Sequence, residues 1–328
     1  MRAQSVREYL EAVNALFVER GFHSPVDFAG EAGPAYTLYE VVKTWEEEPN
    51  RRTHLTPEFI EAVRERASHD KSQNGFSNAI NDHIILGRCN GHRLSEYGQQ
   101  TQQKIDYHEL PCGTRRIIKA FLRKDFRFLD NQERTIKDPI NNLDLIDTIE
   151  ITWRVQKNRR NGQRISWKRD HARPHLCPVL AAWRIYSRSV RLGQADDQPM
   201  GVYFDRKKVR YITGTKIAKY FKSVAAQVFP DITKTELGAY SAHMIRVSAC
   251  VILQVADKEA DFIKMRLRWE SDSYRVYLRN TSLLAKRHLE ASTETHIYAL
   301  TERNLNPLPI TVTPQVDPDE VGTYEDFI

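Results

Sequence analysis

Residues 239–281 read AYSAHMIRVSACVILQVADKEADFIKMRLRWESDSYRVYLRNT, and the rest of the chain is interpreted outward from this stretch. His243 and Arg246 are three positions apart, a spacing that places both side chains on one face of a helix. The apolar residues behind them predict a buried helix that holds the pair rigidly at its N-terminal end. A fixed imidazole and guanidinium suit a phosphoryl transition state, and Tyr277 can supply a nucleophile.

This stretch resembles the C-terminal signature of the tyrosine recombinases, the phage-integrase family. That signature is His-x-x-Arg, then a His or Trp, then the nucleophilic Tyr. His243 and Arg246 match its first part, Trp269 takes the middle position, and Tyr277 follows eight residues later. The resemblance implies that Trp269 and His243 donate hydrogen bonds to the reacting phosphate, while Arg246 binds its oxygens.

The later part of the stretch is most similar to the Crypton-type recombinases of eukaryotic mobile elements. Their motif is roughly Arg-Trp-x-Ser-Asp, followed by an aromatic residue and then the tyrosine. Tyr274 competes with Tyr277 as the nucleophile, but the motif places an aromatic residue three positions before the reactive one, which favours Tyr277. The matching residues here are Arg268, Trp269, Ser271, Asp272, Tyr274 and Tyr277.

Residues 91–97, GHRLSEY, resemble the first arginine motif of the same family, Gly-x-Arg-x-Ser-Glu. Arg93 would be the first phosphate-binding arginine and Glu96 its supporting acid. The motif is short, but it precedes the His-x-x-Arg motif by about 150 residues, in the order that the family requires. The alternative is an arginine on a helix surface with a Glu partner, worth a few tenths of a kcal/mol.

Residues 148–168 predict a β-hairpin. Apolar and polar residues alternate over residues 149–156, as in a strand with one buried face. Asn161-Gly162 is a strong signal for a type I′ turn, and residues 163–168 form the returning strand.

The family carries its catalytic lysine on a β-hairpin in this position. Lys157 is the best match, Lys168 on the returning strand is the alternative, and a solvated basic loop is the plain structural explanation. The lysine would protonate the departing 5′ oxygen. The hairpin is also rich in side chains that can contact a DNA backbone: Arg159, Arg160, Arg164, Lys168 and Arg169.

Charge is distributed unevenly along the 328 residues. The net charge of the whole chain is +6, and residues 291–328 carry seven acidic residues against one arginine, which leaves +12 on residues 1–290. A basic body favours a polyanionic partner such as nucleic acid. The four cysteines form no C-x-x-C pair, which argues against a zinc site and for a reducing compartment.

Four regions are expected. Residues 1–48 predict a short helical region, with helices ending at Gly21 and covering 37–48, that partly corresponds to the family's core-binding domain. Residues 49–54 are a linker. Residues 55–290 form the catalytic domain, which begins with a helix capped by Thr56 and Pro57. Residues 291–328 form an acidic, proline-containing tail.

The expected fold is mainly α with a small antiparallel β-sheet, that of the tyrosine recombinase, or DNA breaking-rejoining enzyme, catalytic domain. The resemblance implies a site-specific recombinase that cleaves and rejoins double-stranded DNA through a 3′-phosphotyrosyl link, for integration or excision of a mobile element. That link keeps the bond energy, so no cofactor and no metal are expected. A homo-tetramer is expected in the synaptic complex, with a monomer left open for the free protein.

Two other functions compete with this one. The first is a type IB topoisomerase-like enzyme, which shares the chemistry, and the second is a catalytically idle DNA-binding protein descended from a recombinase. The N-terminus has no apolar signal region, and no apolar run approaches the roughly 18 residues of a membrane span. The expected location is intracellular, and nuclear if the source is a eukaryote.

Overall fold

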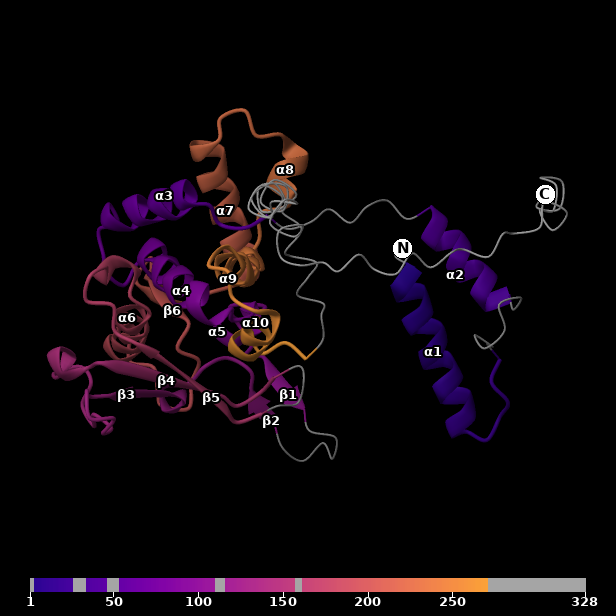
Figure 1. Ribbon diagram of the computed structural model, residues 1–328, viewed down its shortest axis with the longest axis horizontal. Coiled ribbons are helices and arrows are strands. Elements are labelled where there is room, and N and C mark those ends of the chain that lie inside the picture. The colour runs from indigo at the N-terminus through magenta and orange to yellow at the C-terminus, as the bar shows by residue number, and fades with distance from the viewer. Residues whose placement is uncertain (1–2, 26–33, 46–52, 110–115, 157–160, 271–328) are drawn as a thin grey trace, which may run out of the picture.

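The computed structural model describes residues 3–25, 34–45, 53–109, 116–156 and 161–270, and these parts of the chain are mainly helical (Figure 1). Their strands form three small antiparallel sheets. The predicted fold class, mainly α with small antiparallel β structure, is confirmed, with the strands divided among three sheets rather than one. No helix within these ranges has the length and apolar character needed to cross a membrane.

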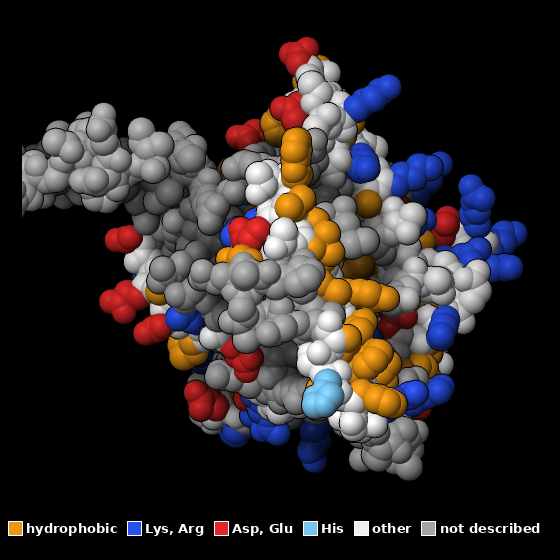
Figure 2. Space-filling model, turned by 90° about the vertical axis from the view of Figure 1, so that its right-hand side faces the viewer, with side chains coloured by type: hydrophobic (Ala, Val, Ile, Leu, Met, Phe, Trp, Pro, Cys, Tyr) orange, Lys and Arg blue, Asp and Glu red, His pale blue; other side chains and the backbone are white. Residues whose placement is uncertain are grey.

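The first two helices, α1 (Ala3–Glu19) and α2 (Pro34–Thr44), pack on each other and stand apart from the main body in Figure 1. The chain leaves α1 through Gly21, whose φ of 78° suits glycine. Trp45, directly after α2, is 83% exposed. Figure 2 views the molecule from this side and shows hydrophobic side chains across its middle, with Lys and Arg side chains gathered toward one edge.

The main body is organised around α4 (Phe76–Asn90). This helix packs against α3 (Pro57–Ser68), α6 (Pro178–Arg191) and α9 (Met244–Val255). Most of its residues from Ala79 to Leu86 are buried, the apolar ones together with Asp82 and His83, and it ends at Gly91 in the left-handed conformation (φ 58°). The end of α4 therefore lies inside the molecule, beside α9.

The predicted start of α3 is confirmed. The Thr56 hydroxyl accepts the N–H of Phe59 (3.3 Å), and Pro57 is the first helical residue. The apolar face of α3 joins a core that extends from Leu55 to Ile245 and includes residues of most elements of the main body. A smaller cluster joins α9 to α10 (Ala260–Leu267).

One sheet contains the predicted hairpin. Strands β3 (Phe126–Leu129), β4 (Thr148–Trp153) and β5 (Gln163–Lys168) lie in that order. The predicted type I′ turn is wrong, because β4 pairs with β5 up to Trp153 opposite Gln163, so that residues 154–162 all lie in the connection. Asn161 instead accepts the N–H of Gln156 through its side chain (2.7 Å), a local hydrogen bond that competes with the tight turn.

The remaining elements complete the body around this sheet and α4. They are β1 (Tyr107–Glu109) paired with β2 (Arg116–Ile118), β6 (Val202–Asp205) paired with β7 (Lys208–Tyr211), the helices α5 (Leu94–Tyr97), α7 (Gly214–Val228) and α8 (Lys234–Gly238), and 3-10 turns at Arg123–Asp125, Leu143–Leu145 and Pro174–Leu176.

Candidate active site

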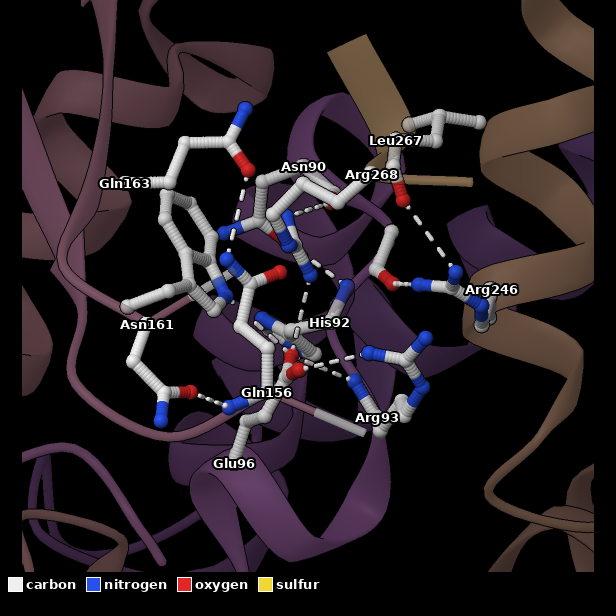
Figure 3. A network of polar contacts seen from close by, with 12 residues as sticks. Asn90, His92, Arg93, Glu96, Gln156, Asn161, Gln163, Arg246, Leu267 and Arg268 are labelled. Atoms are coloured by element: carbon white, nitrogen blue, oxygen red, sulfur yellow. Dashed lines mark hydrogen bonds and ion pairs between the residues drawn. The ribbon is translucent and has the colours of Figure 1, made fainter. Parts of the chain in front are cut away.

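Three segments that are far apart in the sequence meet at the buried end of α4 (Figure 3). The start of α5 supplies Arg93 and Glu96, α9 supplies Arg246, and the chain leaving α10 supplies Arg268 and Trp269. Four of the predicted site residues are therefore in one cluster. The two arginine motifs of the sequence thus lie side by side in the fold.

Glu96 is the centre of the cluster. One carboxylate oxygen, Oε2, accepts the backbone N–H of Arg93 (2.8 Å), and the other, Oε1, accepts Nη1 of Arg93 (3.1 Å). The indole Nε1 of Trp153 also donates to Oε2 (3.3 Å). Burial raises the pKa of Glu96, but the guanidiniums of Arg268, Arg93 and Arg246 more than offset this and hold the pKa below its ordinary value. Glu96 is therefore an ionised, fixed acceptor.

The two predicted phosphate-binding arginines differ in exposure. The side chain of Arg93 is 24% exposed, whereas Arg246 is 1% exposed. Arg246 donates through Nη1 to the carbonyl of Gly91 and through Nη2 to that of Leu267 (3.1 Å). Burial, and next the charge on Arg93, lower the pKa of Arg246 to about 9. The two guanidiniums thus lie close enough to repel each other, and the hydrogen bonds of the second go to backbone carbonyls rather than to an acid.

His243 is in the predicted position on its helix. It directly precedes α9 and its carbonyl accepts the N–H of Arg246 (3.0 Å), so the pair lies in the first turn of a buried helix. The His243 side chain is half-buried. The helix predicted behind this pair is present, with His243 at its N-terminus, and the catalytic role of the pair stays a prediction.

Trp269 stacks on Arg246. The Cζ atom of the guanidinium lies 4.2 Å from the centre of the indole ring. Burial raises the pKa of the neighbouring Cys250 thiol to about 11, with smaller opposing effects from Arg246 and from a hydrogen bond with Trp269. The indole is thus part of the packing around Arg246, in addition to the donor role that the family resemblance implies.

Sequence reasoning assigned no role to Arg268, although it precedes Trp269 in the quoted motif. Its side chain is 0% exposed and donates through Nη2 to Oε2 of Glu96 (3.1 Å). A second N–H, on Nη1, donates to the carbonyl of Asn90 (2.9 Å). The site therefore contains a third arginine, and the Arg-Trp dipeptide was the signal for it.

A layer of buried rings lies next to the cluster. His92 and His83 are both buried and lie edge-on to each other, with ring centres 5.6 Å apart. Both rings are tilted against that of Tyr97, at 4.5 Å for His92 and 4.8 Å for His83. Burial is the main cause that lowers the pKa of His92 to about 3 and that of His83 well below its usual range. Both imidazoles are neutral near pH 7. The positive charge of the site is thus concentrated in its arginines.

Several predicted residues lie outside the described part of the chain. Lys157, Arg159 and Arg160 are in the connection between β4 and β5, and Tyr277 follows residue 270, the last residue described. Their roles stay predictions. The same holds for Tyr274 and for the acidic tail.

The described basic residues of the hairpin differ in what they contact. Arg164 and Lys168 are exposed on the outer face of β5. Lys168 pairs with Asp147 (2.7 Å) and lies opposite Thr148, five residues or about 16 Å along the strand from the connecting loop. Arg169 donates to the backbone carbonyls of Leu143 and Ile146 (2.8 and 3.0 Å). Of these, Arg164 is the one placed beside the loop, on an open face.

Metal binding needs several ligands in one place. Across the residues described in the structure, no group of three or more His, Cys, Asp or Glu side chains is positioned to hold a metal ion.

Comparison with known proteins gives weak likenesses. No family model matches the chain. The structure is similar to that of the XerH site-specific recombinase bound to its difH substrate, with a TM-score of 0.38, 14% identity, and coverage of 84% of this chain and 67% of that one. It is also similar to the XerA recombinase, with a TM-score of 0.39, 12% identity, and coverage of 88% and 82%.

In sequence, 131 residues are 26% identical to DNA polymerase I A, chloroplastic/mitochondrial, of Arabidopsis thaliana. The match covers 40% of this chain and 12% of that protein, so the chain spans only a small part of that relative. At these scores none of the likenesses assigns the chain to a family.

Proposed function

We propose that this chain is a tyrosine recombinase that breaks and rejoins DNA, with Tyr277 as the nucleophile. The observation that supports it is the convergence of Arg93, Arg246 and Trp269, from segments as much as about 175 residues apart, around one buried carboxylate, Glu96. A cluster of arginines with a single acid has a surplus of positive charge. Phosphodiester cleavage develops negative charge on the non-bridging oxygens, which such a cluster stabilises.

The reaction assigns each residue one step. The Tyr277 oxygen attacks phosphorus, a bond forms between them, and the bond from phosphorus to the 5′ oxygen breaks. The phenol has an ordinary pKa of about 10, and adjacent guanidiniums favour its ionised form. His243 accepts the phenol proton, and Lys157 protonates the departing 5′ oxygen. The product is a 3′-phosphotyrosyl link, which a free 5′ hydroxyl reverses.

The finer parts of the proposal rest on fewer residues. The Crypton-type branch, and integration or excision of a mobile element, rest on the motif at 268–277. A tetrameric synaptic complex rests on the family resemblance alone. Double-stranded DNA as the partner is supported by the net charge of the body and by the Lys and Arg side chains gathered at one edge in Figure 2.

A specific observation favours a second candidate, an idle DNA-binding protein. Arg246 is buried, stacked on Trp269 and bonded to two backbone carbonyls, so DNA reaches Arg93 first. In the idle protein this arrangement would be permanent, and DNA would bind without reaction. In the enzyme, DNA binding would bring the scissile phosphate to both arginines.

The experiment that separates them is covalent trapping. The chain is incubated with nicked duplexes. Cleavage beside the nick releases a short fragment with the 5′ hydroxyl, so the broken strand cannot be resealed, and the sequence around the nick is randomised because the target sequence is not known. Protein–DNA adducts are then isolated under denaturing conditions. We expect an adduct with the natural chain and with Tyr274→Phe, and none with Tyr277→Phe. An adduct with Tyr277→Phe would disprove the assigned nucleophile. DNA binding without any adduct would support the idle protein.

The topoisomerase-like alternative needs one further measurement. Relaxation of supercoiled plasmids that lack the sequences recovered in the trapped duplexes would favour it, because a site-specific recombinase acts only at its own sites.

A further inference from the structure

Arg268 has a backbone conformation that is unusual for its residue type. It follows α10 in the left-handed region, at φ 59° and ψ 49°. This is the position at which a helix often ends in glycine, because a Cβ atom destabilises the left-handed conformation. An arginine persists in such a place when its side chain makes interactions that offset the strain.

The contacts of the Arg268 side chain are of that kind. It is fully buried and paired with Glu96, it donates to the carbonyl of Asn90, and its Cζ atom lies 3.9 Å from the centre of the Trp153 indole. Trp153 in turn donates to the same oxygen of Glu96. The carboxylate is thus held from one side by a cation and an indole that do not reach solvent.

The other side of Glu96 is turned to Arg93. The oxygen Oε1 accepts the Arg93 guanidinium, while Oε2 accepts Arg268 and the Arg93 backbone N–H. Arg268 therefore fixes the acid, and the acid fixes the partly exposed arginine. Losing the buried cation would leave Glu96 without its main buried partner and would loosen Arg93.

The same turn also orders the second arginine. Leu267, Arg268 and Trp269 are consecutive, and the chain turns at Arg268. The side chain of Arg268 therefore contacts Glu96, while the Leu267 carbonyl and the Trp269 ring contact Arg246. The carbonyl of Leu267 accepts Arg246, and the ring of Trp269 stacks on it. One turn of the chain thus contacts Arg246 directly and reaches Arg93 through Glu96.

We infer that Arg268 is a positioning residue of the reaction, which acts through Glu96 to orient the guanidinium of Arg93 toward the scissile phosphate. The inference rests on the proposed function. It assigns Arg268 no contact with DNA, because its side chain is enclosed by protein. It predicts that removal of Arg268 lowers the rate of cleavage more than the affinity for DNA.

The first test uses Arg268→Gly, which keeps the left-handed turn and removes the guanidinium, together with Arg268→Lys, which keeps a charge. With the nicked duplex at saturating concentration, we expect the rate of adduct formation to fall about 10–100-fold in Arg268→Gly. Losses of this size are typical when a residue that orients a metal ligand is removed, and Arg268 orients Arg93 in a comparable way. Arg268→Lys should recover part of it. Arg266→Ala is the matched control. It removes a guanidinium of α10 that stacks on Trp167 of β5, and it should leave the rate unchanged.

The path through Glu96 is tested by combining variants. If Arg268 acts through the acid, Arg268→Gly together with Glu96→Gln reacts no more slowly than the slower single variant. Independent, multiplying losses would overturn the inference. So would an Arg268→Gly protein that forms adduct at the natural rate.

A test without activity separates this inference from the proposed function. The groups around Glu96 are Arg93, Arg246, Arg268, Trp153 and the neutral His92. Since the folded pKa of Glu96 is lowered, its pairing stabilises the fold above the ordinary carboxyl pKa of about 4.3 and is lost as the pH falls through the folded value.

The melting temperatures of the natural chain and of Arg268→Gly should therefore differ most at pH 7 and converge as the pH falls below about 4.3. In a Glu96→Gln background this pH-dependent difference should be absent. A constant difference from pH 7 to the acid limit would overturn the inference, whether or not the chain cleaves DNA. If the natural chain forms no adduct but the difference narrows as expected, the proposed function fails and the Arg268–Glu96 pairing stands. If Arg268→Gly does not fold, Arg268→Gln, which also removes the positive charge and fills more of the space, supplies the same comparison.

Discussion

In the described part of the chain, two buried carboxylates each bind two arginines, and they do so differently. Asp82 on α4 pairs with Arg184 and Arg188, which are one turn apart on α6. Glu96 pairs with Arg93, three residues before it, and with Arg268, which is 172 residues further along the chain. The first arrangement joins two helices, and the second joins the two halves of the candidate site.

The surroundings of the two acids separate a structural pair from a candidate site. Each acid has a third guanidinium nearby. That of Arg191, near Asp82, is exposed and donates to Oδ1 of Asn74 (3.2 Å), whereas that of Arg246, near Glu96, is buried and held by backbone carbonyls and an indole. The Glu96 cluster thus has three arginines for one carboxylate. An acid paired with arginines is not by itself evidence of an anion-binding site. Additional fixed positive charge beyond that pairing is what favours the binding of an anion.

The largest difference between the clusters should be in cleavage. Arg93→Ala removes the exposed donor of the Glu96 cluster, and we expect a loss of about 100–1,000-fold in the rate of adduct formation. Arg184→Ala removes the half-exposed arginine of the Asp82 cluster and should leave the rate of the folded protein unchanged. The measurement is single-turnover trapping on the same nicked duplex. Equal losses in both variants would remove the distinction.

The Asp82 cluster should matter more for stability. Asp82→Asn leaves Arg188, of which only 3% is exposed, without its acid. Breaking a buried pair in this way costs about 3–5 kcal/mol. Denaturant unfolding of the natural chain and the variant measures it, with Glu61→Gln as a control, since Glu61 forms a solvent-exposed pair with Arg64 that contributes little to stability. A loss no larger than that of the control would contradict this.

Local parts of this picture could be predicted from the sequence. The His243/Arg246 helix, the capped start at Thr56 and the pairing of β4 with β5 follow from residue spacing, capping and alternation, which act within a few residues. The motif at Arg93 was found by resemblance, and its Glu96 partner followed from the i, i+3 spacing.

The rest depended on contacts between distant segments. Nothing local indicates that Arg268 reaches Glu96, because the pair exists only once the ends of α4 and α10 meet. A left-handed arginine also opposes the conformational preference of its residue type. The predicted turn at Asn161-Gly162 failed for a related reason, since the side chain of Asn161 forms a hydrogen bond that the turn signal does not include.

The two clusters are linked by a pair of neutral histidines. The charge on Arg188 contributes to the low pKa of His83, and those on Arg268 and Arg246 contribute to that of His92, although burial is the main cause for both. The folded pKa of His92 is about 3, against an ordinary value of 6.5. Between these values the unfolded chain binds a proton that the folded chain does not, so stability falls as the pH falls.

His92 should contribute about 1.4 kcal/mol per pH unit within that window, and His83 should act in the same direction. His92→Phe keeps a ring of similar shape and should remove one such contribution from the slope of unfolding free energy against pH between about pH 6 and 4. His83→Phe is the matched variant beside the other cluster and should do the same. A slope that neither substitution alters would show that other groups control acid unfolding.

The smallest expected effect concerns the backbone that holds Arg246. Gly91 has a φ of 58°, its carbonyl accepts Arg246, and a Cβ atom there would lie 3.1 Å from Cδ2 of Leu267. Gly193 has a similar φ of 69° with no atom within 4 Å of its would-be Cβ. Substitution by Ala costs about 1–2 kcal/mol of backbone strain at either position.

Gly193→Ala should therefore lose stability alone. Gly91→Ala should lose slightly more stability, because Leu267 must shift, and should also slow adduct formation, because Leu267 and Gly91 supply the two carbonyls that fix Arg246. Unfolding and single-turnover trapping of the two variants, side by side, measure both effects. If the two variants cleaved equally well, the carbonyl frame around Arg246 would have no part in the chemistry, and only the carboxylate side of the Glu96 cluster would distinguish it from the Asp82 cluster.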